Sequence, residues 1–319
     1  MSVSKQLSRR DFAKAGLALG ACAALGPGLL DAQDASLVMK KIPSSGESIP
    51  AIGIGTARRY DVGPNAPERV ELKEVLRLFA QLGGRVIDTA PSTDEVSASS
   101  GQAETVVGDL VADLGNRKSY FFATKVGARG KEAGLRQIDQ SFQKLRTDQI
   151  DLLQVHNLMD TATQLATLRD LKEKGRIRYL GVSISSDDQH AELEGIMKAQ
   201  KLDFIMVNYA LDSRAAADRV LPLAADRGIG VMIDLPFGRG RLFQAVQNQK
   251  LPDWASQFDC RTWAQFFLKY LVSHPAVTCV VPGTAQVKYV ADNLDSARGR
   301  LPDAAMRKRM EQFIDDIKT

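Results

Sequence analysis

The sequence contains little cysteine. Its 319 residues include three, Cys22, Cys260 and Cys279, and no two of them have a C-x-x-C spacing. That spacing is typical of zinc sites and of short disulfide frameworks, so we predict no metal site and no disulfide framework. One pair stays open, because Cys260 and Cys279 would share an oxidising compartment if the chain is exported, although Cys279 falls within a predicted core strand.

The sequence also lacks an excess of charge of one sign. Lys and Arg together number 42, Asp and Glu number 38, and both kinds are mixed along the chain. A basic stripe with interleaved aromatic residues, the footprint of many nucleic-acid-binding proteins, is missing. We therefore expect no nucleic-acid partner. With 44% apolar residues the composition is that of an ordinary globular protein with a sizeable core.

A hydrophobic run suited to spanning a membrane is missing as well. The apolar stretch from Ala15 to Leu30 is short and rich in glycine, and the paired arginines Arg9 and Arg10 precede it. The residues from Ser8 to Lys14 have the S-R-R-x-F-x-K spacing of a twin-arginine export signal. We predict that residues 1–35 are this signal, that the twin-arginine export machinery is a partner, and that the mature protein is periplasmic with no stable membrane span.

Two alternatives to a cleaved signal stay open. Residues 1–35 would otherwise form a basic helix that remains attached to the protein. The stretch "LGAC" ending at Cys22 resembles a lipoprotein cleavage site, but apolar residues continue beyond Cys22 and argue against lipidation. For a cleaved signal, the region of residues 32–35 is the expected cleavage site.

The rest of the chain alternates between two kinds of segment. Amphipathic stretches such as residues 68–83 and 163–175 have apolar residues at three- and four-residue spacing, which predicts helices. Several of them end at a glycine, which is the expected helix C-cap: Gly83, Gly115, Gly175 and Gly228. Between the helices lie short runs rich in β-branched residues, which predict strands. These runs are 51–56, 85–90, 120–126, 150–156, 177–184, 204–210, 230–236 and 277–283.

Eight strands, each followed by a helix, indicate an α/β fold of the (β/α)8 TIM-barrel type rather than an open sheet. The stretch "KKIPSSGESIP" before the first strand predicts an N-terminal β-hairpin that covers the barrel floor. No linker or shift of composition divides residues 36–319, so we expect a single domain.

Three ionisable residues end successive predicted strands: Asp88, Lys125 and His156. Active sites of such barrels lie at the C-terminal ends of the strands, so these side chains are expected to converge at one mouth. Each has an ordinary structural alternative. Asp88 could cap the next helix, Lys125 could be solvated, and His156 could be a partly buried ring with its hydrogen bonds satisfied.

The order of several motifs resembles the aldo-keto reductase family, particularly its exported bacterial members. The motifs are "IPSSGESIPAIGIGT", "VIDTAP", "FFATKVG", "IDLLQVHNL", "GRIRYLGVS" and "VVPGTAQVKYVADNL". The resemblance covers residues 40–319 and implies reversible hydride transfer between NADPH and a small carbonyl compound, with NADH not excluded. It implies that Asp88, Lys125 and His156 are three of four catalytic residues. Lys125, paired with Asp88, would lower the pKa of a proton donor, and His156 would orient the carbonyl.

The fourth catalytic residue of the family, a tyrosine, is replaced here. The family stretch P-x-Y-G-x-A-E reads "PSTDEVSASSGQAE", which puts Thr93 or Ser100 at the tyrosine position. An aliphatic hydroxyl is a far poorer acid than a phenol. Tyr60, in the loop after the first strand, is a candidate substitute donor or else a packed loop aromatic. A water held by Lys125 and His156 is a further alternative.

The loops after the seventh and eighth strands are expected to hold the cofactor phosphates. Gly238 and Gly240 permit close backbone approach, Arg239 and Arg241 supply charge, and Gly283 and Thr284 precede a helix; the alternative is a basic, solvated loop. Adding the positions that the resemblance implies, the predicted cofactor-binding residues are Gly55, Thr56, Ser183, Asn208, Gly238, Arg239, Gly240, Arg241, Pro282, Gly283, Thr284, Lys288 and Asn293.

The nicotinamide end departs further from the family. Ser183 matches the residue that contacts the carboxamide, but Ile184 and Met206 replace an Asn and a Gln, and Asp234 replaces a ring-stacking aromatic. Two hypotheses therefore compete. The chain is either an NAD(P)H-dependent carbonyl reductase with a substitute donor or a catalytically impaired barrel that binds a nucleotide or another small ligand. Different acid–base chemistry in the Ser- and Asp-rich loop is a third, weaker hypothesis.

Overall fold

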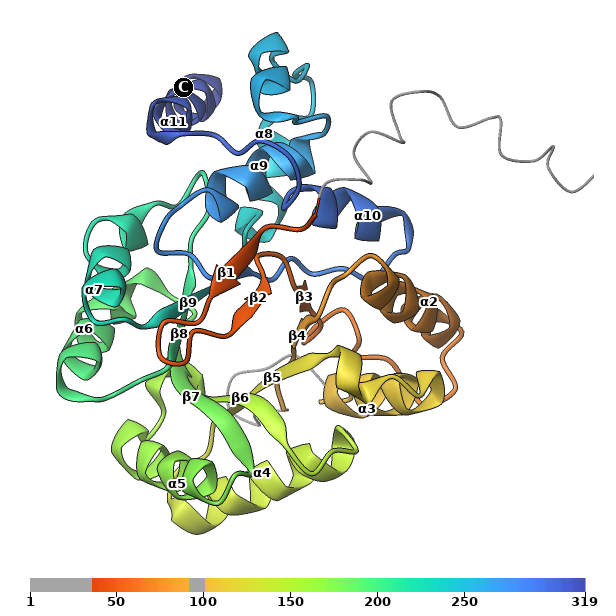
Figure 1. Ribbon diagram of the computed structural model, residues 1–319, viewed down its shortest axis with the longest axis vertical. Coiled ribbons are helices and arrows are strands. Elements are labelled where there is room, and N and C mark those ends of the chain that lie inside the picture. The colour runs from red at the N-terminus through yellow and green to blue at the C-terminus, as the bar shows by residue number, and fades with distance from the viewer. Residues whose placement is uncertain (1–35, 92–100, 319) are drawn as a thin grey trace, which may run out of the picture. The chain divides into compact units, whose positions relative to one another are not determined.

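Eight parallel strands form the centre of the fold (Figure 1). The computed structural model describes residues 36–91 and 101–318. Each of the eight predicted strand regions contains an observed strand. The strands are β3 (Ile54–Gly55), β4 (Val86–Asp88), β5 (Phe121–Val126), β6 (Ile150–Val155), β7 (Ile177–Ser183), β8 (Phe204–Asn208), β9 (Gly230–Asp234) and β10 (Cys279–Val280).

The sheet closes on itself between its first and last strands. Neighbouring strands pair in the order β10-β9-β8-β7-β6-β5-β4-β3. Parallel bridges from Ile52 to Val280 and from Gly55 to Gly283 then join the β3 segment to the β10 segment. The backbone bond from Gly55 N to Pro282 O, at 3.0 Å, lies in this seam. The predicted (β/α)8 barrel is therefore confirmed.

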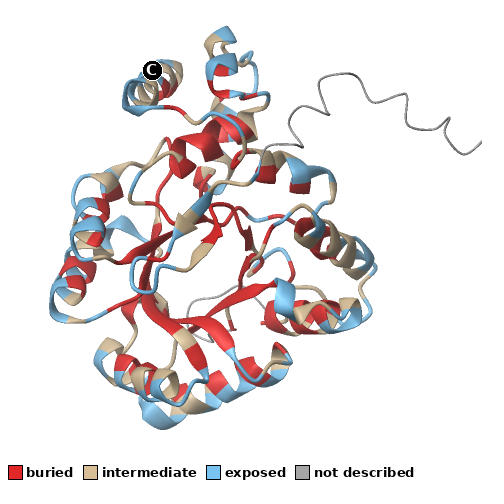
Figure 2. Ribbon diagram, viewed as in Figure 1, coloured by how far each residue is buried: buried red, intermediate tan, exposed pale blue. Residues whose placement is uncertain are grey.

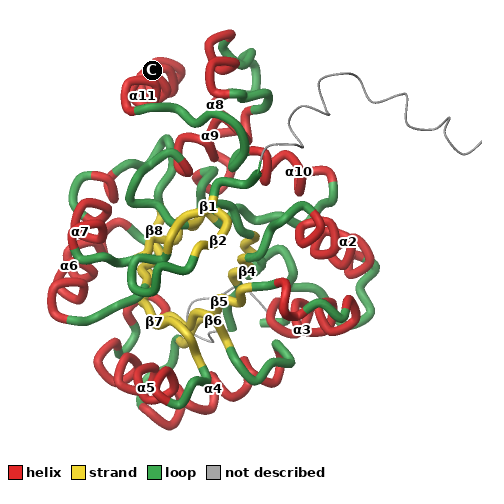
Figure 3. Tube along the Cα trace, in the orientation of Figure 1, coloured by secondary structure: helices red, strands yellow, loops and turns green. Residues whose placement is uncertain are grey.

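Helices surround the strands (Figure 3). They are α2 (Glu68–Gln81), α3 (Ala103–Leu114), α4 (Lys131–Lys144), α5 (Thr161–Glu173), α6 (His190–Ala199), α7 (Val220–Asp226), α8 (Arg241–Ala245), α9 (Trp263–Val272), α10 (Lys288–Asp295) and α11 (Ala304–Lys318). The four glycines predicted as helix C-caps all have positive φ, between 64° and 91°. This is the left-handed conformation that a C-cap glycine adopts without strain.

The hydrophobic core has two layers, because side chains of a strand alternate between its two faces. The inner layer fills the barrel and includes Phe121, Leu152 and Phe204. The outer layer lies between strands and helices and includes Phe122, Leu153 and Ile205, each one residue further along the same strands. Figure 2 shows the buried strands inside and exposed helix faces outside.

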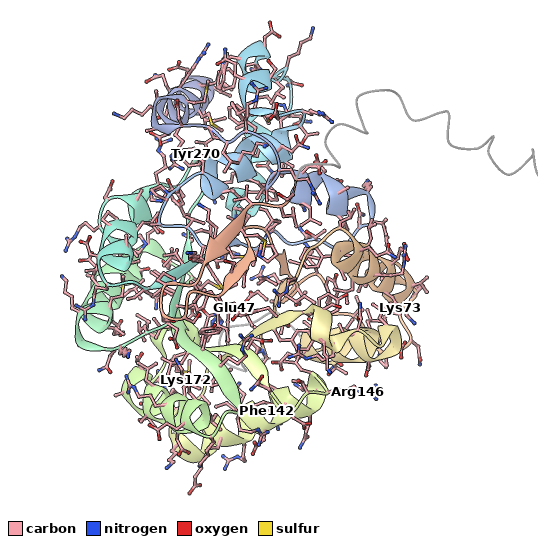
Figure 4. All side chains as sticks on the ribbon, in the orientation of Figure 1. Glu47, Lys73, Phe142, Arg146, Lys172 and Tyr270 are labelled. Carbon is pink, nitrogen blue, oxygen red and sulfur yellow. The ribbon has the colours of Figure 1, made fainter. Side chains whose placement is uncertain are left out.

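A two-stranded hairpin covers the N-terminal end of the barrel, as predicted. Strands β1 (Met39–Lys41) and β2 (Ser48–Pro50) pair antiparallel, and Ile42 and Ile49 join the inner core layer. The Tyr179 hydroxyl donates a hydrogen bond of 2.6 Å to Glu47 in the hairpin turn. Figure 4 shows Glu47 over the centre of the barrel. Because the hairpin closes this end, ligand access is left to the opposite, C-terminal end.

Both described cysteines are free and buried. Cys260 lies in the outer core layer and Cys279 in the inner layer. The sheet separates the two thiols, so the structure contradicts a Cys260–Cys279 disulfide.

Some sequence predictions concern residues outside the described ranges. The export signal in residues 1–35, with Cys22, and the replaced tyrosine position at Thr93 or Ser100 are among them. Among the helices of residues 36–91 and 101–318, none combines the length and the hydropathy that a membrane crossing requires.

Candidate active site

Polar side chains gather at the C-terminal end of the barrel interior. Alternation along the strands turns Asp88, Lys125, Gln154, Asn208 and Asp234 inward, each beyond an apolar inner-core residue two positions earlier in its strand. In a barrel this end carries the active site. The described residues contain no group of three or more His, Cys, Asp or Glu side chains arranged to hold a metal ion.

Asp88 and Lys125 form a buried ion pair. Lys125 Nζ lies 2.7 Å from Asp88 Oδ1 and 2.9 Å from Asp88 Oδ2, and it donates to the Thr89 carbonyl at 2.9 Å. The two side chains are only 5% and 8% exposed. Burial raises the pKa of the Asp88 carboxyl, and the Lys125 charge opposes that rise. The three acceptor oxygens match the three N–H donors of the ammonium, so its position is fixed.

His156 lies immediately after β6 and next to this pair. Its Nδ1 is 3.1 Å from Ser183 Oγ on the neighbouring strand. The next two residues, Asn157 and Leu158, have positive φ values of 49° and 55°, so the chain turns sharply just beyond the ring. Burial, and next the charge of Lys125, lower the pKa of His156 to about 4. The imidazole is therefore neutral at neutral pH, with Nε2 left to meet a ligand.

The structure thus brings the three predicted catalytic side chains to one end of the barrel, on the consecutive strands β4, β5 and β6. A neutral imidazole and a fixed ammonium on neighbouring strand ends can polarise and orient a carbonyl oxygen. The imidazole does not need to change its protonation state to do so at neutral pH.

Gln154 is a site residue that the sequence did not indicate. It lies beside Lys125 in the register of β5 and β6. Its side chain is completely buried, and neither of its amide atoms has a hydrogen-bond partner among the described residues. Buried amides are normally satisfied by protein or by water. The amide therefore provides unpaired hydrogen-bonding groups beside Lys125, two residues before His156.

Tyr60 lies away from this site. Its ring is completely buried in the outer core layer, which is on the helix side of the sheet. Burial, with a smaller contribution from neighbouring Tyr120, raises the pKa of its phenol. A proton donor needs the opposite shift. The placement corrects the hypothesis that Tyr60 replaces the missing donor and supports its interpretation as a packed loop aromatic.

This placement gives a first testable prediction. The Tyr60 hydroxyl has no hydrogen-bond partner among the described residues. Tyr60→Phe removes an unsatisfied buried hydroxyl and should raise the free energy of unfolding by about 1 kcal/mol, with carbonyl reduction unchanged. Thermal unfolding and steady-state kinetics measure the two effects. A large loss of turnover in a folded Tyr60→Phe protein would return Tyr60 to the mechanism.

The seam between β3 and β10 shapes one part of the mouth. A Cβ on Gly55 would lie 2.9 Å from the Val281 carbonyl oxygen, so only glycine fits there. Thr56 donates two hydrogen bonds to the backbone carbonyl oxygen of Asp88, one from its N–H at 2.8 Å and one from its hydroxyl at 3.0 Å. These two predicted cofactor residues therefore also fix the strand that carries Asp88.

Buried hydrogen bonds hold the loop after β10 in place. Thr284 Oγ1 donates to the Pro282 carbonyl at 3.1 Å, and Asn293 Nδ2 donates to Thr284 Oγ1 at 2.9 Å. Thr284 and Asn293 are both buried, so they tie the loop to α10. Gly283 is exposed and forms the open part of the loop. Lys288 is exposed as well, with Nζ 4.9 Å from the centre of the Tyr289 ring.

The loop after β9 forms the short 3-10 helix η5 (Gly238–Gly240) and then α8. Arg241 was predicted to contact a phosphate, but its Nε donates a hydrogen bond of 3.1 Å to Asp212 Oδ2, so the side chain already has an anionic partner within the protein. Arg239 is exposed, and its charge opposes the rise in the pKa of Asp234 that burial causes. Gly238 has a positive φ of 56°, a conformation that favours glycine there.

Arg59 is a second residue that the sequence did not indicate. A Cβ on Gly283 would lie 3.4 Å from Arg59 Cγ and 3.5 Å from Arg59 Nε, so the arginine side chain lies over the open part of the phosphate loop. Among the described residues, Arg59, Arg239 and Lys288 take part in no salt bridge. Three cations with no such partner beside two glycine-containing loops fit a phosphate-bearing cofactor.

Asn208 and Ser183, also predicted to bind cofactor, lie between the loops and the ion pair. Asn208 Nδ2 donates to Asp187 Oδ1 at 2.8 Å. Its Oδ1 is buried and has no partner among the described residues. Ser183 Oγ lies 3.1 Å from His156 Nδ1 and 3.4 Å from the carbonyl oxygen of Val155. A buried acceptor without a donor fits a ligand that brings an N–H group.

Comparisons with known proteins agree with this geometry. The model of the Aldo/keto reductase family matches residues 51–314. Methylglyoxal reductase YeaE of Escherichia coli is 30% identical over 261 residues, covering 80% of this chain and 88% of the relative. The NADH-specific methylglyoxal reductase of the same organism is 26% identical over 250 residues, covering 68% and 73%. A crystal structure of an aldo/keto reductase from Klebsiella pneumoniae, in complex with NADP and acetate, is similar with a TM-score of 0.71 at 25% identity. It covers 86% of this chain and 95% of its own.

Proposed function

Because the chain belongs to the aldo/keto reductase family, we propose that it is an NAD(P)H-dependent reductase of small aldehydes or ketones. The observation that carries the proposal is the buried Asp88–Lys125 pair, 2.7 Å between Nζ and Oδ1, beside His156. The neighbouring loops, with Arg59, Arg239 and Lys288, suit the phosphates of the cofactor. The related structure that contains NADP supports this assignment.

Each residue of the site has a separate task in this proposal. A bound nicotinamide supplies the hydride. His156 is neutral because its pKa is lowered to about 4. In the tautomer with the proton on Nε2, in which Nδ1 accepts from the Ser183 hydroxyl, it donates a hydrogen bond to the carbonyl oxygen and fixes its direction. Lys125, held by Asp88 and Thr89, stabilises the negative charge that develops on that oxygen. Burial makes this electrostatic stabilisation stronger than it would be at the surface.

The proton donor differs from that of the family, in which a tyrosine supplies the proton. The family tyrosine is replaced at Thr93 or Ser100, outside the described residues, and Tyr60 lies behind the sheet. All three N–H donors of Lys125 have an acceptor in Asp88 or Thr89. We therefore propose that a water beside His156 gives a proton to the alkoxide and that the hydroxide left behind takes a proton from bulk solvent. Without a phenolic acid, turnover should be slower by about 10²–10⁴-fold than in a reductase that has one.

Cofactor binding is predicted to depend on the exposed cations of the loops. Arg59→Ala should weaken NADPH binding by about three- to tenfold, because an exposed cation near a phosphate contributes modestly. Titration of the protein's fluorescence with NADPH measures this. Lys118→Ala is a matched control, because it also removes one exposed cation. Lys118 precedes the N-terminal end of β5, whereas the cofactor loops lie at the C-terminal ends of the strands. Equal effects of the two variants would contradict the assignment of Arg59.

A second candidate function is a ligand-binding barrel without efficient turnover. It is favoured by the replaced tyrosine together with Ile184, Met206 and Asp234 at the nicotinamide end. The deciding experiment mixes the protein with NADPH and a panel of aldehydes, following cofactor fluorescence and the absorbance of reduced nicotinamide. Oxidation of NADPH that depends on the aldehyde supports the reductase. Binding without oxidation supports the ligand-binding protein, and an absence of NADPH binding and oxidation contradicts an NADPH-dependent reductase.

Export stays part of the proposal. The arginine pair Arg9–Arg10 and the residues that follow suit the twin-arginine route, and the periplasm is the proposed location. This route carries folded proteins, so the enzyme would take up its cofactor in the cytoplasm. Replacing both arginines by lysine should leave the protein in the cytoplasmic fraction. An unchanged distribution would contradict the export signal.

A further inference from the structure

Two unpartnered oxygens lie next to each other at the mouth of the barrel. Asn208 ends β8, Asp234 ends β9, and the two residues are partners in the parallel register. Both side chains face inward. The Oδ1 atom of each is buried and has no hydrogen-bond partner among the described residues. Two adjacent buried acceptors without donors indicate a ligand group with more than one N–H.

The strand order places these two oxygens on the path of the cofactor. The cationic loops follow β9 and β10, whereas Asp88, Lys125 and His156 end β4, β5 and β6. On the side of the closed barrel that leads from the loop after β9 to His156, a dinucleotide crosses the ends of β9, β8 and β7. Along this path Met206 lies in the inner core and Ile184 in the outer core, and both are apolar. The polar side chains that remain are Ser183, Asn208 and Asp234.

We infer that Asn208 and Asp234 bind the carboxamide N–H₂ of the nicotinamide ring, and that the Asp234 carboxylate favours the oxidised, positively charged ring. The inference rests on the proposed function, because it takes a nicotinamide cofactor as the ligand. A carboxamide has the two N–H groups that the two oxygens require. Hydride transfer leaves a positive charge on the ring, and a carboxylate at the ring stabilises that charge.

The charges around Asp234 support this role. The ionisable groups that act on it are Lys125 from β5, Asp88 from β4 and Arg239 from η5. Lys125 and Asp88 neutralise each other, and Arg239 is exposed. Burial raises the pKa of Asp234 to about 7. A cationic ring lowers that pKa again, so binding of the oxidised cofactor should strengthen as pH rises through about 7.

The test measures dissociation constants for NADP⁺, NADPH and 2′,5′-ADP with the full chain at pH 6 and pH 8. The nucleotide 2′,5′-ADP carries the adenosine phosphates without the nicotinamide ring, so it corrects for titration of those phosphates. In the wild-type protein, affinity for NADP⁺ relative to NADPH should rise by about tenfold between the two pH values, the effect of one pKa unit. In Asp234→Asn, which keeps the size and one acceptor oxygen, this rise should disappear.

Asn208→Ala should weaken both cofactor forms by about tenfold, the effect of one lost buried hydrogen bond.

Both variants should bind 2′,5′-ADP as the wild-type protein does, which also shows that they are folded. If the NADP⁺/NADPH ratio responds to pH in Asp234→Asn as it does in the wild type, the inference is overturned while the proposed function stands. If Asn208→Ala weakens 2′,5′-ADP as much as NADPH, the carboxamide assignment is overturned. Failure of the wild-type protein to bind 2′,5′-ADP at all would instead refute NADP(H) as the cofactor.

Discussion

Replacing Lys125 by methionine is expected to reduce carbonyl reduction by about 10²–10⁴-fold and to destabilise the protein by about 3–5 kcal/mol. The catalytic loss follows because methionine is similar in length but cannot stabilise charge on the carbonyl oxygen. The loss of stability follows because the variant leaves Asp88, 8% exposed, as a buried carboxyl without its cation. Steady-state kinetics and denaturant unfolding measure the two losses separately.

A double variant separates catalysis from folding. Asp88→Asn combined with Lys125→Met removes both charges, so no buried charge is left unpaired. We expect this protein to regain most of the lost stability and none of the lost activity. Turnover in either variant at close to the wild-type rate would show that the ion pair is structural only.

The second large effect is expected from Asp234→Asn, which should stabilise the protein above neutral pH. The pKa of Asp234 is raised from an ordinary value of 3.8 to about 7 in the folded state. Between these values the folded state binds more protons than the unfolded state, so the Asp234 contribution to stability is lost as pH rises from about 4 through 7. A shift of about three pKa units corresponds to at most about 4 kcal/mol. Asparagine does not titrate and avoids this loss.

The measurement is the free energy of unfolding of the wild type and of Asp234→Asn at pH 5 and at pH 8. The difference between the two proteins should favour Asp234→Asn more at pH 8 than at pH 5. Asp188→Asn is a matched control, because Asp188 is an exposed acid in the loop after β7. An equal difference at both pH values would mean that Asp234 is already ionised, with a normal pKa, in the folded protein.

Much of this site could be predicted from strand patterns. Asp88, Lys125 and His156 stand at or just after the ends of apolar, β-branched runs, and in a parallel barrel all such ends meet at one mouth. Two glycines of the loop after β9, Gly238 and Gly240, have positive φ values of 56° and 95°, a conformation that favours glycine. Gly55 in β3 is required for another reason, because a Cβ there would lie 2.9 Å from the Val281 carbonyl oxygen.

Other features depend on contacts between distant parts of the chain. Arg239 and Arg241 look equivalent in the sequence, but Arg241 pairs with Asp212 from a different loop and Arg239 does not. Tyr60 lies in a loop at the mouth, and only packing decides that its ring turns behind the sheet. Asp234 was noticed as a departure from the family, but its unpartnered oxygen beside Asn208 follows from strand register.

The central claim is that Asp88, Lys125 and His156 support direct hydride transfer from a nicotinamide cofactor to a carbonyl carbon. The most direct test uses NADPH that carries deuterium at C4 of the nicotinamide ring, an aldehyde substrate and mass analysis of the alcohol. The account predicts that the wild-type protein transfers the label to the carbinol carbon and that Lys125→Met does so at a rate lower by about 10²-fold or more. An alcohol without label, or equal transfer by both proteins, would contradict it.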